Sequence, residues 1–115
     1  MSILLKSFRH ALTGIRYATK GRNFQIHISV GLLAILLGVY LHISKTDLIV
    51  VILTVGFVLS AEGTNTAIEE VCNKFHPQTH PHIALIKDLA AGSVLIAAIA
   101  AGIIGLVVFV PYFIR

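Results

Sequence analysis

The residues with the clearest chemical potential lie in one short stretch, 60–74, which reads SAEGTNTAIEEVCNK. At about 100° per residue, the polar side chains of Glu62, Asn65, Glu69 and Asn73 fall within an arc of about 80° on a helix. Glu70 points away from this polar face. Two carboxylates within reach of each other can hold Mg²⁺ or take up a proton. The polar face is therefore a candidate site for catalysis or for ion binding.

An apolar run, LIVVILTVGFVL, comes directly before this polar face. The uncharged segment 48–61 forms only about 21 Å of helix, whereas the hydrocarbon core of a bilayer is about 30 Å thick. A helix that crosses here must carry Glu62 to the membrane boundary. Carboxylates at such depths are usually functional or paired inside a bundle. A purely structural interpretation is also open, in which the polar face bonds neighbouring helices or faces water.

The composition is that of a small integral membrane protein. Of 115 residues, 57% are hydrophobic and only 12% are charged, and the mean hydropathy is +0.91. The single cysteine, Cys72, excludes an intramolecular disulfide and a zinc cluster built from cysteines. The basic residues flank apolar runs, so the net charge of +4 indicates orientation in a membrane and not nucleic-acid binding.

The apolar runs predict a single all-α membrane domain, 1–115, with three transmembrane helices. We expect an amphipathic interfacial helix at 1–22 and spans at 26–43, 48–74 (extending into the cytoplasm) and 84–114. Lys and Arg concentrate before the first span and between the second and third. This distribution places the amino terminus in the cytoplasm and the carboxyl terminus outside.

Lys87 and Asp88 stand where the third span begins, at the depth expected for the polar face. A site assembled there would contain Glu62, Glu69, Lys87 and Asp88. Carboxylates that hold Mg²⁺ and a lysine that neutralises phosphate oxygens suit phosphoryl transfer at an interface. The same residues suit a cation pathway or a proton relay equally well. The chain contains no G-x-x-x-x-G-K-[ST] motif, which argues against an ordinary P-loop site.

Several segments resemble the prokaryotic diacylglycerol kinase family, the small bacterial membrane lipid kinases that include undecaprenol kinases. They are EGTNTAIEEVCN, His80, KDLAAGSVLIAAI from Lys87, and the earlier KSF and YATKGRNFQIH. The resemblance implies a helical-bundle homotrimer in the bacterial inner membrane, with a surface helix and with active sites shared between neighbouring subunits. It also implies ATP as co-substrate, Mg²⁺ as cofactor and a membrane lipid as acceptor.

The resemblance also assigns roles to individual residues. Glu62 matches the general base, which takes the proton from the lipid hydroxyl, and Glu69 matches a magnesium-binding glutamate. Asn65 and Asn73 are supporting polar residues. The positions that match nucleotide-binding residues are His10, Glu69, His80, Lys87 and Asp88.

Two departures from the family pattern reduce the negative charge expected at the metal site. Relatives commonly carry a glutamate just before Arg22, where this chain has Lys20 and Gly21, and an aspartate where this chain has Asn73. Glu70 is a possible substitute, although its direction argues against it. The leading hypothesis is an ATP-dependent diacylglycerol kinase that makes phosphatidic acid. An undecaprenol kinase, a catalytically impaired membrane scaffold of the same fold and, more weakly, a proton or cation carrier stay open as alternatives.

Overall fold

The computed structural model describes residues 2–75, 78 and 80–114, and these form four α-helices. The helices are α1 (Ile3–Ala18), α2 (Arg22–Tyr40), α3 (Lys45–Phe75) and α4 (Pro81–Phe113). The last three are long and apolar enough to cross a membrane. The prediction of an all-α chain with three such helices is confirmed, and a multi-pass membrane protein follows from it.

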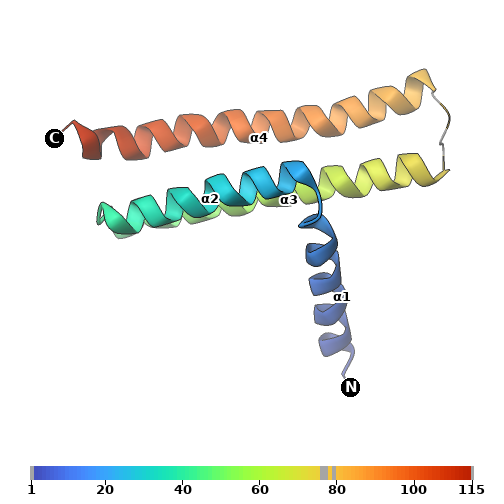
Figure 1. Cartoon of the computed structure of the whole chain (residues 1–115), viewed down its shortest axis with the longest axis horizontal. Helices are drawn as coiled ribbons and strands as arrows, with labels where there is room; N and C mark the ends of the chain where they lie inside the picture. The colour runs from blue at the N-terminus through green and yellow to red at the C-terminus, as the bar shows by residue number, and fades with distance from the viewer. Residues whose placement is uncertain (1, 76–77, 79, 115) are drawn as a thin grey trace.

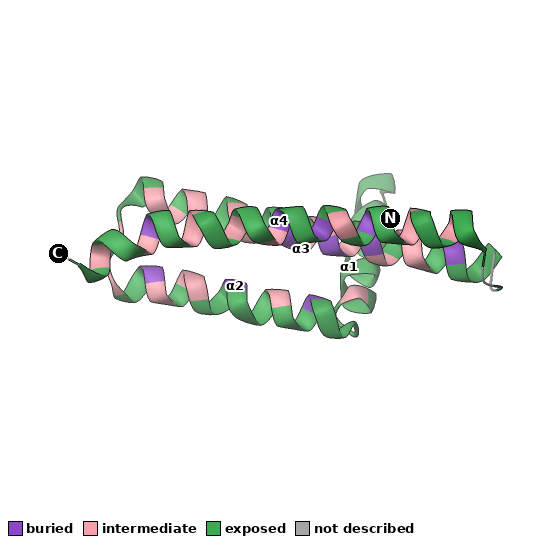
Figure 2. Ribbon diagram, turned by 90° about the horizontal axis from the view of Figure 1, so that it is seen from above, coloured by how far each residue is buried: buried purple, intermediate pink, exposed green. Residues whose placement is uncertain are grey.

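The three apolar helices form a bent layer with α3 at the bend, in contact with both of the others (Figures 1 and 2). α2 and α3 are antiparallel and joined by the short turn 41–44, which we call the hairpin end. α3 and α4 run past the start of α2 toward the segment that joins them, which we call the connector end (Figure 1). α1 joins the start of α2 and runs crosswise to the axes of the other three helices (Figure 1).

Among the described residues, the buried ones lie in α2, α3 and α4, and α1 contains none (Figure 2). Most are small or branched, and they include Val51, Val58, Val94, Ala97 and Val108. Many large apolar side chains remain exposed, among them Leu33, Leu53, Ile96 and Leu106. Such an apolar exterior is the surface that lipid tails cover, because a soluble monomer of this size exposes much smaller apolar patches.

The helices extend beyond the apolar runs because polar turns continue them outside the lipid. α2 begins at Arg22, ahead of the first span predicted at 26, and Gly21 is its extended N-cap. α4 begins at Pro81, ahead of the predicted residue 84. The proline occupies a first-turn position, where its missing N–H costs nothing, and the His80 side chain caps the helix by accepting a hydrogen bond from the His82 amide.

Two polar contacts fix the register of α4 along α3, one at each end of the layer. At the hairpin end the Tyr112 hydroxyl donates to Asp47 Oδ2 (2.7 Å) and accepts from the Ser44 amide (3.0 Å). At the connector end Lys87 Nζ donates to Asn73 Oδ1 at 3.0 Å. Because α4 is one continuous helix, these two contacts together set the depth of Lys87 relative to the polar face of α3.

The register of α2 on α3 depends on a glycine. Gly31 is buried against α3, and a Cβ added there would lie 2.6 Å from Val55 Cγ1. Glycine lets two helices approach closely in a membrane, where dispersion contacts between well-packed helices do most of the stabilising. Any larger residue at this position must push the two helices apart.

Candidate functional site

The polar face predicted from the sequence lies on the packed side of α3. Glu62 and Asn65 are buried, with exposures of 4% and 5%, in a helix whose other buried residues are Val51, Val58 and Cys72. Glu69 is half-buried and Asn73 is exposed, so the face leads from the packed layer out toward the connector end. A carboxylate with so little contact with water needs a partner or a function, since burying an unpaired charge is costly.

Asn65 and Glu69 are joined one helical turn apart. Asn65 Nδ2 donates to Glu69 Oε1 at 2.7 Å, whereas the buried Asn65 Oδ1 has no hydrogen-bond partner among the described residues. Buried polar atoms are nearly always satisfied, so an unpartnered acceptor beside a carboxylate indicates a place for a donor or a cation. Carboxylate and amide oxygens are also the ligand types that Mg²⁺ prefers.

The pair offers a cation only part of a coordination shell. The described residues contain no group of three or more His, Cys, Asp or Glu side chains that could hold a metal ion. Mg²⁺ commonly keeps several waters and binds through one or two carboxylates together with substrate phosphates. Glu69 with Asn65 therefore fits a magnesium ion that arrives with a nucleotide, and does not fit an ion caged by protein alone.

Lys87 reaches the same face of α3 from α4. It is half-buried, and its ammonium group is held by Asn73, one turn beyond Glu69. Asp88 follows it on α4 and is exposed. The structure therefore places Lys87 at the outer end of the polar face that carries Glu62, Asn65 and Glu69, and a lysine there can neutralise phosphate oxygens.

The predicted histidines lie elsewhere. His80 precedes α4, and its Nδ1 is engaged by the His82 amide at 3.1 Å. His10 is exposed on α1, which projects away from the layer (Figure 1). Among the described residues, no hydrogen bond or ion pair joins either histidine to Glu69.

Two contacts of acidic residues were not anticipated from the sequence. His27 Nε2 on α2 lies 3.9 Å from Glu62 Oε2, with side-chain exposures of 24% and 6%. On another side of α3, the Tyr17 hydroxyl on α1 lies near the Glu70 carboxylate. Hydrogen bonding to Glu70, together with the negative charge of that carboxylate, raises the pKa of Tyr17 above its ordinary value. Glu70 thus ties α3 to α1.

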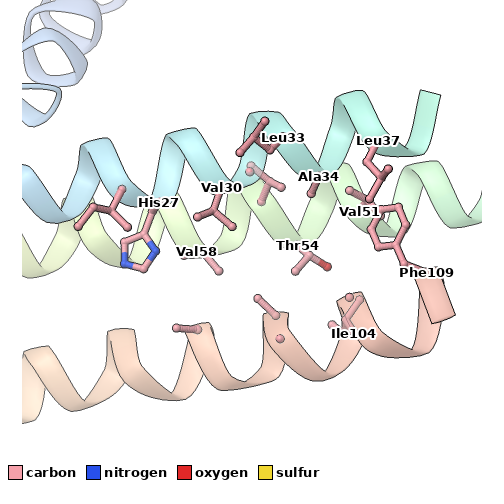
Figure 3. Close-up of a pocket in the computed structure, with 17 residues that line it drawn as sticks. His27, Val30, Leu33, Ala34, Leu37, Val51, Thr54, Val58, Ile104 and Phe109 are labelled. Carbon is pink, nitrogen blue, oxygen red and sulfur yellow. The ribbon is translucent and has the colours of Figure 1, made fainter. Parts of the chain in front are cut away.

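An apolar pocket of about 570 Å³ opens between α2, α3 and α4 (Figure 3). It extends along the layer from His27 to Phe109, and Val30, Leu37 and Ile104 are among its lining residues. Among the described lining residues, His27 alone is ionisable. A long apolar chain fits such a lining, because it leaves no buried polar group unpaired.

Comparison with known proteins places the chain in a family. The profile described as Prokaryotic diacylglycerol kinase matches residues 9–109, which include every residue of the polar face. The chain belongs to the prokaryotic diacylglycerol kinase family. The resemblance inferred from the sequence motifs is therefore confirmed.

Individual relatives carry two different names. The chain is 42% identical to a diacylglycerol kinase of Synechocystis sp. over 94% of its own length, and the match spans 63% of that relative. It is 36% identical to an undecaprenol kinase of Bacillus subtilis, over 92% of this chain and 87% of the relative. It is 28% identical to a diacylglycerol kinase of Haemophilus influenzae, over 88% and 86%. The family and these names support a lipid kinase, a phosphotransferase that acts on an alcohol group.

Proposed function

We propose that this protein transfers the γ-phosphoryl group of ATP to the hydroxyl of a membrane lipid, with diacylglycerol as the leading acceptor and phosphatidic acid as the product. The observation that carries the proposal is the buried Glu62 carboxylate on the same face of α3 as the Asn65–Glu69 pair. A proton acceptor and a cation site side by side are the two parts that phosphoryl transfer to an alcohol needs.

In the proposed reaction, Glu62 takes the proton of the lipid hydroxyl as its oxygen attacks the γ-phosphorus. The bond between that phosphorus and the bridging oxygen of ADP breaks in line, and ADP leaves with the electron pair. Glu69 would hold Mg²⁺, and the ion would neutralise charge on the phosphates. Lys87 contributes a further positive charge to the phosphates, and most of the rate gain comes from positioning and charge neutralisation.

The position of Glu62 along α3 suits a reaction between a lipid and a soluble nucleotide. α3 has 31 residues, about 46 Å of helix, and exceeds a hydrocarbon core of about 30 Å. His27, opposite Glu62, lies in the second turn of α2, close to the point where α1 departs. With α1 lying on the membrane surface, the carboxylate meets hydrocarbon on one side and the Asn65–Glu69 pair on the other.

We propose a homotrimer in the bacterial inner membrane, with the amino terminus in the cytoplasm. In such an assembly, His10, His80 and Asp88 contact the nucleotide from neighbouring subunits or after α1 has moved. The support from this chain is that Lys87 is bonded to Asn73 on the polar face, whereas no hydrogen bond or ion pair found among the described residues joins His10 or His80 to that face.

Undecaprenol is the second candidate acceptor, because a relative of similar length carries that name. Both lipids present a hydroxyl at the end of a long apolar body, and the pocket between α2 and α4 is apolar enough for either.

A scaffold that has lost activity is the third candidate. It follows from the Asn73 position and from the absence of a metal-binding group of three or more among the described residues.

The deciding experiment is transfer of labelled phosphate from Mg·ATP in mixed micelles that contain diacylglycerol and undecaprenol together. We expect label in one lipid, which names the acceptor, and no label with the isosteric variant Glu69→Gln. If the folded wild-type protein labels neither lipid, the kinase proposal is wrong and the scaffold leads. If Glu69→Gln labels lipid at the wild-type rate, the proposed metal site is wrong.

A further inference from the structure

His27 faces the carboxylate that the proposed reaction uses as its base. Its Nε2 lies 3.9 Å from Glu62 Oε2, and both side chains are largely shielded from solvent. We propose that His27 is a positioning residue, which engages one oxygen of Glu62 so that the other is aimed at the hydroxyl of the acceptor. This inference rests on the proposed function, because it assigns the partner of the proposed base.

The packing of α2 on α3 brings these two residues together. Gly31 lies one helical turn after His27, and Val55 lies two turns before Glu62. Because the helices are antiparallel, the close contact between Gly31 and Val55 places the preceding part of α2 against the following part of α3. The register that the glycine allows therefore delivers the imidazole to the carboxylate.

Chemistry also favours this pairing. A carboxylate as buried as Glu62 needs a donor, since an unpaired buried charge is expensive. An imidazole supplies one N–H from Nε2 while its other nitrogen remains available for a second contact. The observed distance is longer than a hydrogen bond, and contacts at active sites often tighten only when substrate binds.

The location of His27 gives the pairing a further consequence. Among the described lining residues of the apolar pocket, His27 is the ionisable one, and it stands at one end of that pocket (Figure 3). A lipid body in the pocket would pass the imidazole before its polar end reaches Glu62. His27 therefore stands between the apolar pocket and the Glu62 carboxylate. The sequence motifs assigned no role to it.

The test compares two substitutions of similar size. His27→Gln places an N–H donor near the position of Nε2, whereas His27→Met fills the space without a donor. We expect His27→Met to lower kcat by about 10- to 100-fold, the size of loss known for removing the hydrogen-bond partner of a metal-binding side chain, because His27 orients Glu62 in the same way. We expect its KM for ATP to stay unchanged, and His27→Gln to recover most of the lost kcat.

A matched control removes a histidine far from Glu62. His42 lies at the hairpin end with φ 55, a left-handed conformation that asparagine also adopts readily. His42→Asn is therefore expected to keep wild-type kinetics. The folding and oligomeric state of each variant are checked first, and His27→Ala replaces His27→Met if the latter does not fold.

The possible outcomes separate this inference from the proposed function. Wild-type kcat in His27→Met, or equal losses in the Gln and Met variants, would overturn the positioning role while leaving the kinase intact. A change in KM for ATP with kcat preserved would also overturn it, because it would place His27 with the nucleotide. A folded wild-type protein that transfers no phosphate would overturn both.

Discussion

The contact between Gly31 and Val55 yields the sharpest quantitative prediction. A Cβ at Gly31 would lie 2.6 Å from Val55 Cγ1 and 3.2 Å from Cγ2, so Gly31→Ala forces α2 away from α3. Overpacking of this kind costs about 1–3 kcal/mol. Val55→Ala removes both γ carbons and leaves Val55 Cβ at 3.5 Å, an ordinary contact. The double variant should therefore recover most of the loss, with a coupling energy of about 1–3 kcal/mol.

The assay is reversible unfolding in mixed micelles for the wild type, both single variants and the double variant. Gly56→Ala is the matched control, because its added Cβ would have no described atom within 4 Å apart from the nearby backbone of its own helix and its chain neighbours. We expect that control to be neutral or slightly stabilising, since alanine is the better helix former. Additive effects of the two substitutions, or a Gly31→Ala variant as stable as the wild type, would refute the claim that this contact fixes the position of α2.

Two further predictions concern the other polar contacts of α3. Glu70 raises the pKa of Tyr17. The neutral phenol therefore keeps the α1–α3 contact at any pH below the ordinary tyrosine pKa of about 10, and the contact is lost as the pH rises through the raised pKa. Glu70→Gln should lower the pKa of Tyr17 in an ultraviolet titration, with Tyr17→Phe identifying the component, and an unchanged titration would contradict the contact. Asn73→Asp turns the hydrogen bond with Lys87 into an ion pair that changes the free energy of unfolding by less than about 1 kcal/mol. It should lower the Mg²⁺ concentration that gives half-maximal transfer, because a carboxylate is added beside Glu69, and an unchanged or higher requirement would exclude a metal site there.

Local sequence patterns were sufficient for the helices of this chain. The apolar runs predicted three long helices, and the spacing of Glu62, Asn65 and Glu69 placed them on one face before any packing was known. Helix ends were harder to predict than helix positions, because polar first turns, such as those that begin at Arg22 and Pro81, belong to the helix but not to the apolar run.

Contacts between helices could not be read from such patterns. His27 meets Glu62 only because α2 and α3 pack in the register that Gly31 permits, and nothing in the spacing of either helix specifies that register. Tyr17 meets Glu70 because α1 leaves the layer at the angle seen in Figure 1. A glycine within an apolar helix was the available signal for close approach, although its partner stayed unspecified.

The role of Glu62 is the central claim, and phosphate transfer by Glu62→Gln tests it most directly. This substitution keeps the size of the side chain and removes its ability to accept the proton of the hydroxyl. We predict that kcat falls by about 10²- to 10⁴-fold, the usual contribution of a general base, while the affinity for Mg·ATP is kept. A Glu62→Gln protein that phosphorylates lipid at the wild-type rate would contradict the account.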